Sequence, residues 1–484
     1  MNACSRVLSL NVVKKEPPSV HYYDQDFVDI YDKSWAWIRD SWVKGGATSD
    51  FQKPFFHHSP SPTIHQFDSC MASFFLVYSN AVYSPLTLLD NFYLKQEESG
   101  AIRGEYDLET GAPVMHPNNP EGVHPPLFSW VEFNIYHKLG AKRRIKEVVP
   151  VLEKHFLWLE ANFKQENGLY SVPLAATLME NSPREKAHYP VDFNAQQAMN
   201  ALYLSALGDI LNDKDLAFRY KRAYYSLKTR INSQMWDEAT GFFYDLDAEG
   251  QRLSVRHIGA YWTLLAEIPH EDRAERLIAA LRDEKEFGTP NPFPTLSASH
   301  PSFSKKGNGY CGSVFPALTF MVIKGLEKYG KYELAREAAI KHIYYILDTL
   351  HPDAKEKGSL WEAYQPMQDG AATWEGRDEF NRPNYLHQSG LSSIALMIEN
   401  VVGLYISLPR KTVDWKVPIL ELMGIENLSL KRNFITILSS KSGRGWEIRL
   451  ESEKLYYFTI DILHKKKKTL PIPSGKCSML LEKL

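Results

Sequence analysis

Residues 178–195, LMENSPREKAHYPVDFNA, decide how the fold of this chain is interpreted. The stretch is rich in acidic and basic residues, and two prolines inside it prevent one continuous helix. The apolar residues that follow have helical spacing, so a helix is predicted to begin near Asp192. Two interpretations are open. Glu180 is a carboxylate presented for chemistry at the mouth of a helical scaffold, or it pairs with Arg184 while Asp192 caps the helix.

Helical segments are predicted on both sides of this stretch. In each clear pair the first helix is apolar on more than one face and the second carries a charged stripe, which indicates an inner layer covered by an outer layer. Periodicity alone predicts helical hairpins and not their closure into a ring. The predicted helices are residues 23–43, 67–78, 85–96, 126–140 with 142–163, 192–211 with 214–236, 259–267 with 271–283, 313–329 with 331–350, and 389–404.

The last part of the chain has a different pattern. After Val413, apolar and polar residues alternate between Ser-Gly turns, which predicts a small antiparallel β appendage. We therefore expect an N-terminal arm at residues 1–22, a helical domain at 23–413 and the appendage at 414–484. Packing or dimerisation is the favoured role for the appendage, ahead of ligand binding.

Composition and charge exclude several classes of function. The 484 residues are 44% hydrophobic and 24% charged, with a formal net charge of −2, which supplies no field for nucleic acid or an anionic membrane. The sequence has no apolar run long enough to span a membrane and no secretory signal pattern. The four cysteines, Cys4, Cys70, Cys311 and Cys477, form no C-x-x-C pair, so reduced thiols in a cytoplasm are expected.

Five segments in this order resemble one enzyme family. They are HQFDSCMASFF at 65–75, MENSPR at 179–184, VDFNA at 191–195, GYCGSVFPALTFMVIKGLEKYG at 309–330 and SLWEAYQP at 359–366. Together they resemble the motifs of trehalase-like glycosidases of glycoside hydrolase family 63, near the mannosylglycerate and glucosylglycerate hydrolases. The likeness covers about residues 20–405, and several ordered motifs are more specific than any one alone.

The resemblance implies a fold and a reaction. The fold would be mainly α, an (α/α)6 toroid of helical hairpins with the small β appendage. The reaction would be inverting hydrolysis of a small α-linked glucoside or mannoside, for which two carboxyl groups about 6.5–9.5 Å apart flank the bond. Glu180 matches the general acid and Glu362 the general base, with Glu375 as the fallback base. The family usually has aspartate where this chain has Glu180.

Further residues are implied as walls of the sugar site. Asp68 would hold the sugar ring, and Asp192 is equally consistent with a helix N-cap. The family's tryptophan and arginine are replaced by Tyr310 and Cys311, which suggests a different acceptor. The other implied wall residues are Phe67, Gln96, Trp130, Asn194, Gln197, Tyr364, Gln365, Trp374 and His387.

Neither a metal nor a cofactor is expected, because the loop histidines lack ligand spacing and no nucleotide motif is present. The expected partner is a small oligosaccharide or glycoside, and a homo-oligomer is compatible with the sequence. Two alternative functions stay open. One is a catalytically impaired carbohydrate-binding protein, favoured by glutamate at position 180. The other is a sugar epimerase on the same barrel, for which His257 and His387 are the candidate pair.

Overall fold

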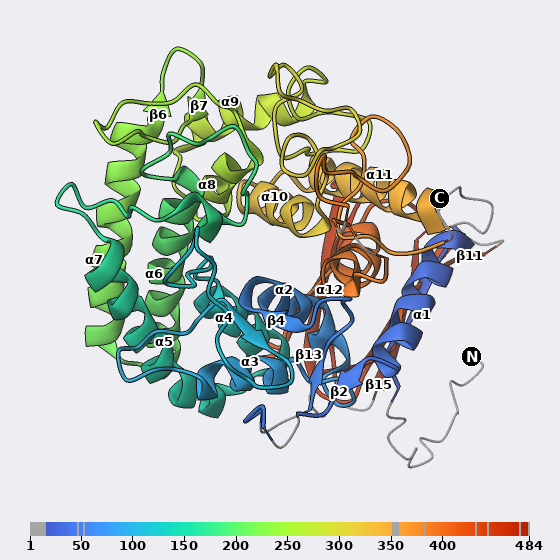
Figure 1. Ribbon diagram of the computed structural model, residues 1–484. Helices are drawn as coiled ribbons and strands as arrows, with labels where there is room; N and C mark the ends of the chain where they lie inside the picture. The colour runs from blue at the N-terminus through green and yellow to red at the C-terminus, as the bar shows by residue number, and fades with distance from the viewer. Residues whose placement is uncertain are drawn as a thin grey trace.

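The computed structural model describes residues 16–45, 48–51, 54–350, 358–378, 380–381, 383–430, 433–442, 445–473 and 476–482. The centre of the helical part of the structure is a ring of inner helices (Figure 1). Each helix of the ring contacts the next, and α12 contacts α2, so the ring is closed. The inner elements are α2 (Gln66–Leu76), α4 (Phe128–Leu139), α6 (Val191–Leu211), α8 (Trp262–Leu265), α10 (Pro316–Lys328) and α12 (Leu386–Gly390), which continues as the π-helix η5 (Leu391–Val401).

Outer helices cover this ring. They are α1 (Gln25–Arg39), α3 (Pro85–Leu94), α5 (Lys142–Phe163), α7 (Lys214–Arg230), α9 (Glu271–Arg282) and α11 (Tyr332–Leu350). Burial explains the two layers. Every residue of α2 is buried, and so is α6 from Val191 to Ala201. The outer helix α7 buries one stripe instead, which a helix with a single apolar face provides. The predicted helical pairs are thus present, and the chain is mainly helical.

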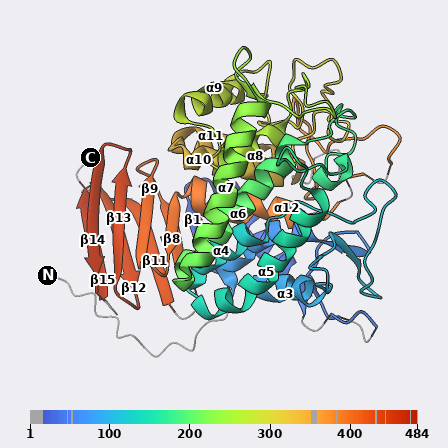
Figure 2. The ribbon, with the colours of Figure 1, turned by 90° about the vertical axis from the view of Figure 1, so that its left-hand side faces the viewer.

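Two β-sheets stand beside the ring (Figure 2). The five-stranded sheet has the order β1 (Ser19–Tyr22), β10 (Met423–Leu430), β11 (Asn433–Ser442), β12 (Gly445–Ser452) and β15 (Lys476–Glu482). The four-stranded sheet has the order β14 (Lys466–Ile472), β13 (Tyr456–Ile462), β9 (Thr412–Val417) and β8 (Leu404–Ser407). Trp415 of one sheet and Trp446 of the other are buried with ring centroids 6.1 Å apart, so the sheets share a core.

The sheets correct three details of the predicted β appendage. Ser19–Tyr22, assigned to a loose arm, pairs in register with β10, while residues 1–15 of that arm lie outside the described residues. The strands begin at Leu404, before the predicted boundary at 414. The pairing is not wholly antiparallel either, because β13 runs parallel to β9. Strand partners depend on tertiary packing, which alternation within one segment does not encode.

Short two-stranded ladders and single turns complete the structure. The ladders are β2 (Trp42–Val43) with β3 (Phe55–Phe56), β4 (Thr63–His65) with β5 (Glu105–Asp107), and β6 (Trp236–Asp237) with β7 (Phe242–Phe243). The turns are η1 (Val77–Ser79), η2 (Leu174–Thr177), η3 (Ile231–Met235) and η4 (Ile258–Tyr261). Within the described part of the chain, no helix has both the length and the apolar character needed to cross a membrane.

Candidate active site

A cavity of about 580 Å³ is lined by inner-helix residues and by loops that precede these helices in the chain. That volume lies in the range of small-molecule sites. Phe67 and Asp68 come from the first turn of α2, Gln196 from α6, and Gln388 from α12. The remaining lining residues are Ser59, Pro60, Ser61, Pro62, His65, Thr177, Leu178, Met179, Glu180, Trp262, Tyr310, Phe315, Leu318, Glu362, Trp374, Gly376, Arg377, Asp378, Phe380, Asn381 and Tyr385.

Glu180 reaches the cavity from the loop after η2. Leu178 has a φ of 62°, a left-handed conformation that turns the chain immediately before Glu180. The Glu180 carboxylate accepts a hydrogen bond from Arg377 Nη1 at 3.2 Å, and its side chain is 39% exposed. The Arg377 guanidinium lies 4.4 Å from the centroid of the Trp374 ring. An ion pair thus spans the cavity wall between two loops.

Asn181 fixes the loop that carries Glu180. Its Nδ2 donates to Asn308 O at 3.0 Å, and its Oδ1 accepts from Tyr310 N at 2.7 Å. Gly309, at a φ of +58°, lies between these contacts. A Cβ there would lie 2.7 Å from both Asn181 Oδ1 and the Trp374 ring, so only glycine allows the three segments to meet.

Arg184 and Asp192 lie behind the cavity in a buried network. Arg184 is fully buried and makes two hydrogen bonds to Asp192, at 2.8 and 2.9 Å, and two to Asp245, at 2.7 and 3.0 Å. The interpretation that Glu180 pairs with Arg184 is therefore wrong. Asp192 is also no N-cap, because Pro190 holds that position and no side chain caps α6. Asp192 is part of the support for the loop, and it does not line the cavity.

Glu362 lines the cavity on the segment between α11 and α12. Ala363 N donates to Asn381 Oδ1 at 3.0 Å, and Tyr364 pairs with Val314, so the backbone around Glu362 is held from both sides. Burial raises the pKa of the Glu362 carboxyl to about 8, the charge of Asp68 adds to the rise, and Arg377 opposes it. In the unliganded protein this carboxyl therefore binds a proton far more readily than an ordinary glutamate.

Asp68 is held rigidly at the cavity wall. Its Oδ2 accepts from the Tyr385 hydroxyl at 2.5 Å, and its Oδ1 accepts from Gln388 Nε2 at 3.1 Å. Both donors come from the start of α12, so α2 and α12 together orient this carboxylate. Charge-assisted bonds of this kind are stronger than bonds between neutral groups.

Six of the predicted site residues line the cavity: Phe67, Asp68, Glu180, Tyr310, Glu362 and Trp374. Several others lie elsewhere because their polar groups are bonded within the protein. Asn194 bonds the backbone of Tyr170, Gln197 bonds Tyr170 and Asn200, the Tyr364 hydroxyl accepts from Trp361 N, and Gln365 donates to Ala371 O. Trp130 is buried against Phe74 and Trp262, and His387 against Phe56. Glu375 is exposed on the loop beside Trp374 and is no part of the lining.

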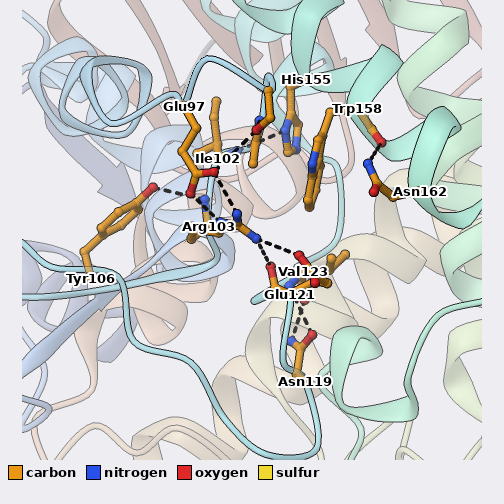
Figure 3. A network of polar contacts seen from close by, with 12 residues as sticks. Glu97, Ile102, Arg103, Tyr106, Asn119, Glu121, Val123, His155, Trp158 and Asn162 are labelled. Atoms are coloured by element: carbon orange, nitrogen blue, oxygen red, sulfur yellow. Dashed lines mark hydrogen bonds and ion pairs between the residues drawn. The ribbon is translucent and has the colours of Figure 1, made fainter.

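The loop that contains Gln96 has a structural role. Gln96 itself donates to Gly100 O and Val151 O. Figure 3 shows Arg103 at the centre of this loop, bonded to Glu97 and Glu121 and 5.4 Å from the Trp158 ring. Asn119 closes a turn by bonding Val123 in both directions. These contacts explain how a long connection stays ordered with only the short strand β5 as regular structure.

Sequence reasoning missed several lining residues, among them Arg377, Tyr385, Asn381, Gln388 and Gln196. Gln196 is adjacent to the predicted Gln197, and one residue turns a helix by about 100°, since a turn holds 3.6 residues. A polar residue on the buried face of α6 was an available signal, but the sequence has two glutamines there and does not say which one faces inward.

Two family models match this chain. The model of the mannosylglycerate hydrolase MGH1-like glycoside hydrolase domain matches residues 92–383, and the model of the trehalase C-terminal domain matches residues 403–484. The first match spans more than half of the 484 residues. Both agree with the predicted resemblance, which is thereby confirmed.

Relatives of known sequence or structure agree with these models. An uncharacterized protein of Borreliella burgdorferi is 53% identical over 97% of this chain and 100% of its own length. The structure of the glycoside hydrolase family 63 mannosylglycerate hydrolase of Thermus thermophilus in complex with glucose matches with a TM-score of 0.58 at 18% identity, over 76% of this chain and 98% of that one. A neutral trehalase of Saccharomyces cerevisiae matches with a TM-score of 0.54 at 14% identity, over 70% and 73% of the two chains. By its sequence, with a fold that agrees, this chain belongs to the mannosylglycerate hydrolase MGH1-like family of glycoside hydrolases.

Proposed function

We propose that the protein is an inverting glycoside hydrolase that cleaves a small α-linked glucoside or mannoside on an (α/α)6 toroid. Glu180 is the general acid and Glu362 the general base. The observation that carries this proposal is that both carboxyl groups line one cavity, from separate loops, beside the rigidly held Asp68. Two carboxyls on opposite sides of a sugar ring are what glycoside hydrolysis needs.

Each residue has a distinct task in this reaction. Glu362 removes a proton from a water molecule that attacks the anomeric carbon, and Glu180 protonates the leaving oxygen. Asp68 accepts hydrogen bonds from the sugar hydroxyls and holds the ring against Trp262 and Phe67, which line the same cavity. Arg377 donates a hydrogen bond to Glu180, so we infer that the bound glycoside separates the two and that Glu180 takes up a proton from solvent before it protonates the leaving oxygen.

A first experiment tests substrate and mechanism together. The purified protein is assayed against α-glucosides and α-mannosides, including their glycerate conjugates, and the first product anomer is followed by proton NMR. The inverted anomer is expected. Glu362→Gln should bind sugar but retain less than a few per cent of the wild-type rate, because the base is lost and the shape is kept. Initial release of the substrate's own anomer would refute an inverting mechanism.

A sugar-binding protein without turnover is the second candidate, and the Glu180–Arg377 ion pair is the observation that favours it. Sugar binding with no hydrolysis of any glycoside in the screen would support it. The epimerase alternative has less support, because His257 and His387 are both buried outside the cavity lining.

We also propose a cytoplasmic location. Its support is that Cys70 and Cys311, the two cysteines whose side chains the structure describes, are both free thiols.

A further inference from the structure

Two glutamines that line the cavity have amide oxygens without a partner. Gln196, on α6, is 1% exposed, and Gln388, on α12, is 5% exposed. The Oε1 atom of each is buried and accepts no hydrogen bond from any described residue. Most buried polar side-chain atoms in proteins are bonded, so two exceptions in one cavity require an explanation.

The orientation of Gln388 follows from its neighbour. Its carboxamide lies 3.1 Å from Asp68 Oδ1, and a carboxylate oxygen can only accept a hydrogen bond. The atom that faces Asp68 must therefore be Nε2, and Oε1 must be on the other side of the amide. Asp68 thus fixes the Gln388 oxygen as an acceptor that the protein itself leaves unused.

Gln196 differs from the glutamine that follows it. Gln197 Nε2 lies 3.4 Å from the Tyr170 hydroxyl, and Gln197 Oε1 accepts from Asn200 at 3.2 Å. Gln196 Oε1 has no hydrogen-bond partner in the described part of the chain, although Gln196 is almost as well buried. Gln197 therefore serves the structure of α6, whereas the amide oxygen of Gln196 has no partner among the described residues.

We propose that Gln196 and Gln388 determine sugar specificity: a small rotation of each side chain on ligand binding exposes its amide oxygen to the cavity, where it accepts a hydrogen bond from a hydroxyl of the bound sugar ring. The ligand class is a neutral sugar whose hydroxyls are free, and a ring lacking either hydroxyl is rejected because the facing oxygen stays buried and unpaired. This inference rests on the proposed function for the nature of the ligand.

Gln196→Met provides the test, because methionine has a similar length and no hydrogen-bonding amide. Titration of the full-length protein with free D-glucose and D-mannose, followed by the fluorescence of the lining tryptophans, should show binding weakened about tenfold, the effect of one hydrogen bond. The Tm of the sugar-free variant should stay equal or rise, because an unsatisfied group has been removed. Gln197→Met is the matched control, and it should lower the Tm while changing sugar affinity less than twofold.

Monodeoxy sugars locate the contact. One deoxy analogue should bind the wild type about tenfold more weakly than the parent sugar does. The same analogue and the parent sugar should bind Gln196→Met with equal affinity. Equal losses for every analogue in both proteins would overturn the inference. A fall in Tm for Gln196→Met as large as that for Gln197→Met would also overturn it, because Oε1 would then have an internal partner.

These readouts do not depend on hydrolysis. A protein that binds sugars with this selectivity but turns over no glycoside would disprove the proposed hydrolase activity and leave the role of the two glutamines intact. A wild-type protein that binds none of these sugars would overturn the specificity proposal, whatever the hydrolysis assays show.

Discussion

At the scale of single residues, the environment of Glu362 should make the proposed reaction depend on pH. The base must be ionised to accept a proton, and its pKa is raised to about 8. Below that pH the ionised fraction of Glu362 falls tenfold per unit, so kcat/KM for a nitrophenyl glycoside, whose cleavage needs little protonation by Glu180, should rise as the pH increases towards about 8. kcat/KM reports the free enzyme, which is the state whose pKa is shifted here. An initial-rate profile at low substrate concentration measures this ascending limb.

Asp68→Asn serves as the control for that profile. The negative charge of Asp68 is the second cause of the raised pKa, so its removal should move the ascending limb to lower pH. Asp68→Asn should also lower kcat/KM at every pH, because the variant binds the sugar less tightly. The pH at which kcat/KM rises must therefore be compared separately from the size of kcat/KM. An unmoved limb would mean that another group titrates.

The proposed role of Glu180 as the general acid can be tested by changing the leaving group of the substrate. Glu180→Gln removes the proton donor, and general acids contribute typically about 10²–10⁴-fold. A natural glycoside should show a loss of that size, whereas a nitrophenyl glycoside, whose leaving group needs little protonation, should show a much smaller one. Comparison of the two substrates on the same variant is the measurement. Equal losses on both would mean that Glu180 is not the acid.

Motifs predicted the residues that carry the proposed chemistry, but only part of the walls around them, among them Phe67, Tyr310 and Trp374. Glu180, Glu362 and Asp68 belong to short segments with recognisable neighbours, and all three line one cavity. Asp192 belongs to an equally recognisable segment, but it is buried against Arg184 and does not line the cavity. Arg184 also binds Asp245, which lies more than fifty positions further along the chain than Asp192. A contact over such a separation has no local signal.

At the scale of elements, Arg184 holds the loop that carries Glu180 to two parts of the scaffold. Asp192 begins α6 and Asp245 follows β7, and both carboxylates bind the one guanidinium. Asp245 Oδ1 also accepts from Val191 N at 2.8 Å, which fixes the first turn of α6. The loop with Glu180 is therefore anchored at Arg184, four residues after Glu180.

Arg184→Met should be strongly destabilising. Removing one partner of a buried charge network leaves uncompensated charges, which typically costs about 3–5 kcal/mol. Urea unfolding of the variant gives the free energy of unfolding, and kcat should fall as the loop loosens. Arg377→Gln is the matched comparison, since it breaks an exposed arginine pair that should contribute at most about 1 kcal/mol to stability. Similar stabilities of the two variants would contradict the anchoring role.

Helices were easier to predict than strands for a physical reason. The charged stripe of α7 and the apolar faces of α6 are local periodicities that follow from how each helix is buried. The pairing of β1 with β10 joins segments from opposite ends of the chain, and the parallel pairing of β13 with β9 also depends on the assembled sheets. Alternation indicates that a segment is a strand and gives no information about its partner.

At the scale of the whole molecule, a buried charge cluster joins the helical ring to the sheets. Glu399 of η5 pairs with Lys138 of α4 at 3.0 Å and with Lys324 of α10 at 2.6 Å, and it accepts a hydrogen bond from Tyr78. Lys324 also pairs with Glu327, which accepts from the hydroxyl of Tyr405 in β8 at 2.8 Å. Inner elements from distant parts of the ring thus meet at the point where β8 begins.

This cluster should make the whole fold sensitive to acid. The two lysines oppose the cost of burying Glu399 and lower its pKa from 4.5 to about 2. Because the folded pKa lies below the unfolded one, the stabilisation is fully present above pH 4.5 and is lost as the pH falls towards 2. A pKa difference of this size corresponds to about 3 kcal/mol as an upper bound.

Glu399→Gln tests the cluster by removing the titrating carboxyl while keeping its shape. At pH 7 the variant should lose about 3–5 kcal/mol, because two lysines are left buried without their counter-charge. Below pH 4.5 the wild type should approach the variant, since protonation of Glu399 has the same effect as the substitution. Urea unfolding of both proteins between pH 7 and pH 3 measures the difference. A stability gap that stays constant over this range would show that Glu399 does not link the ring and the sheets through its charge.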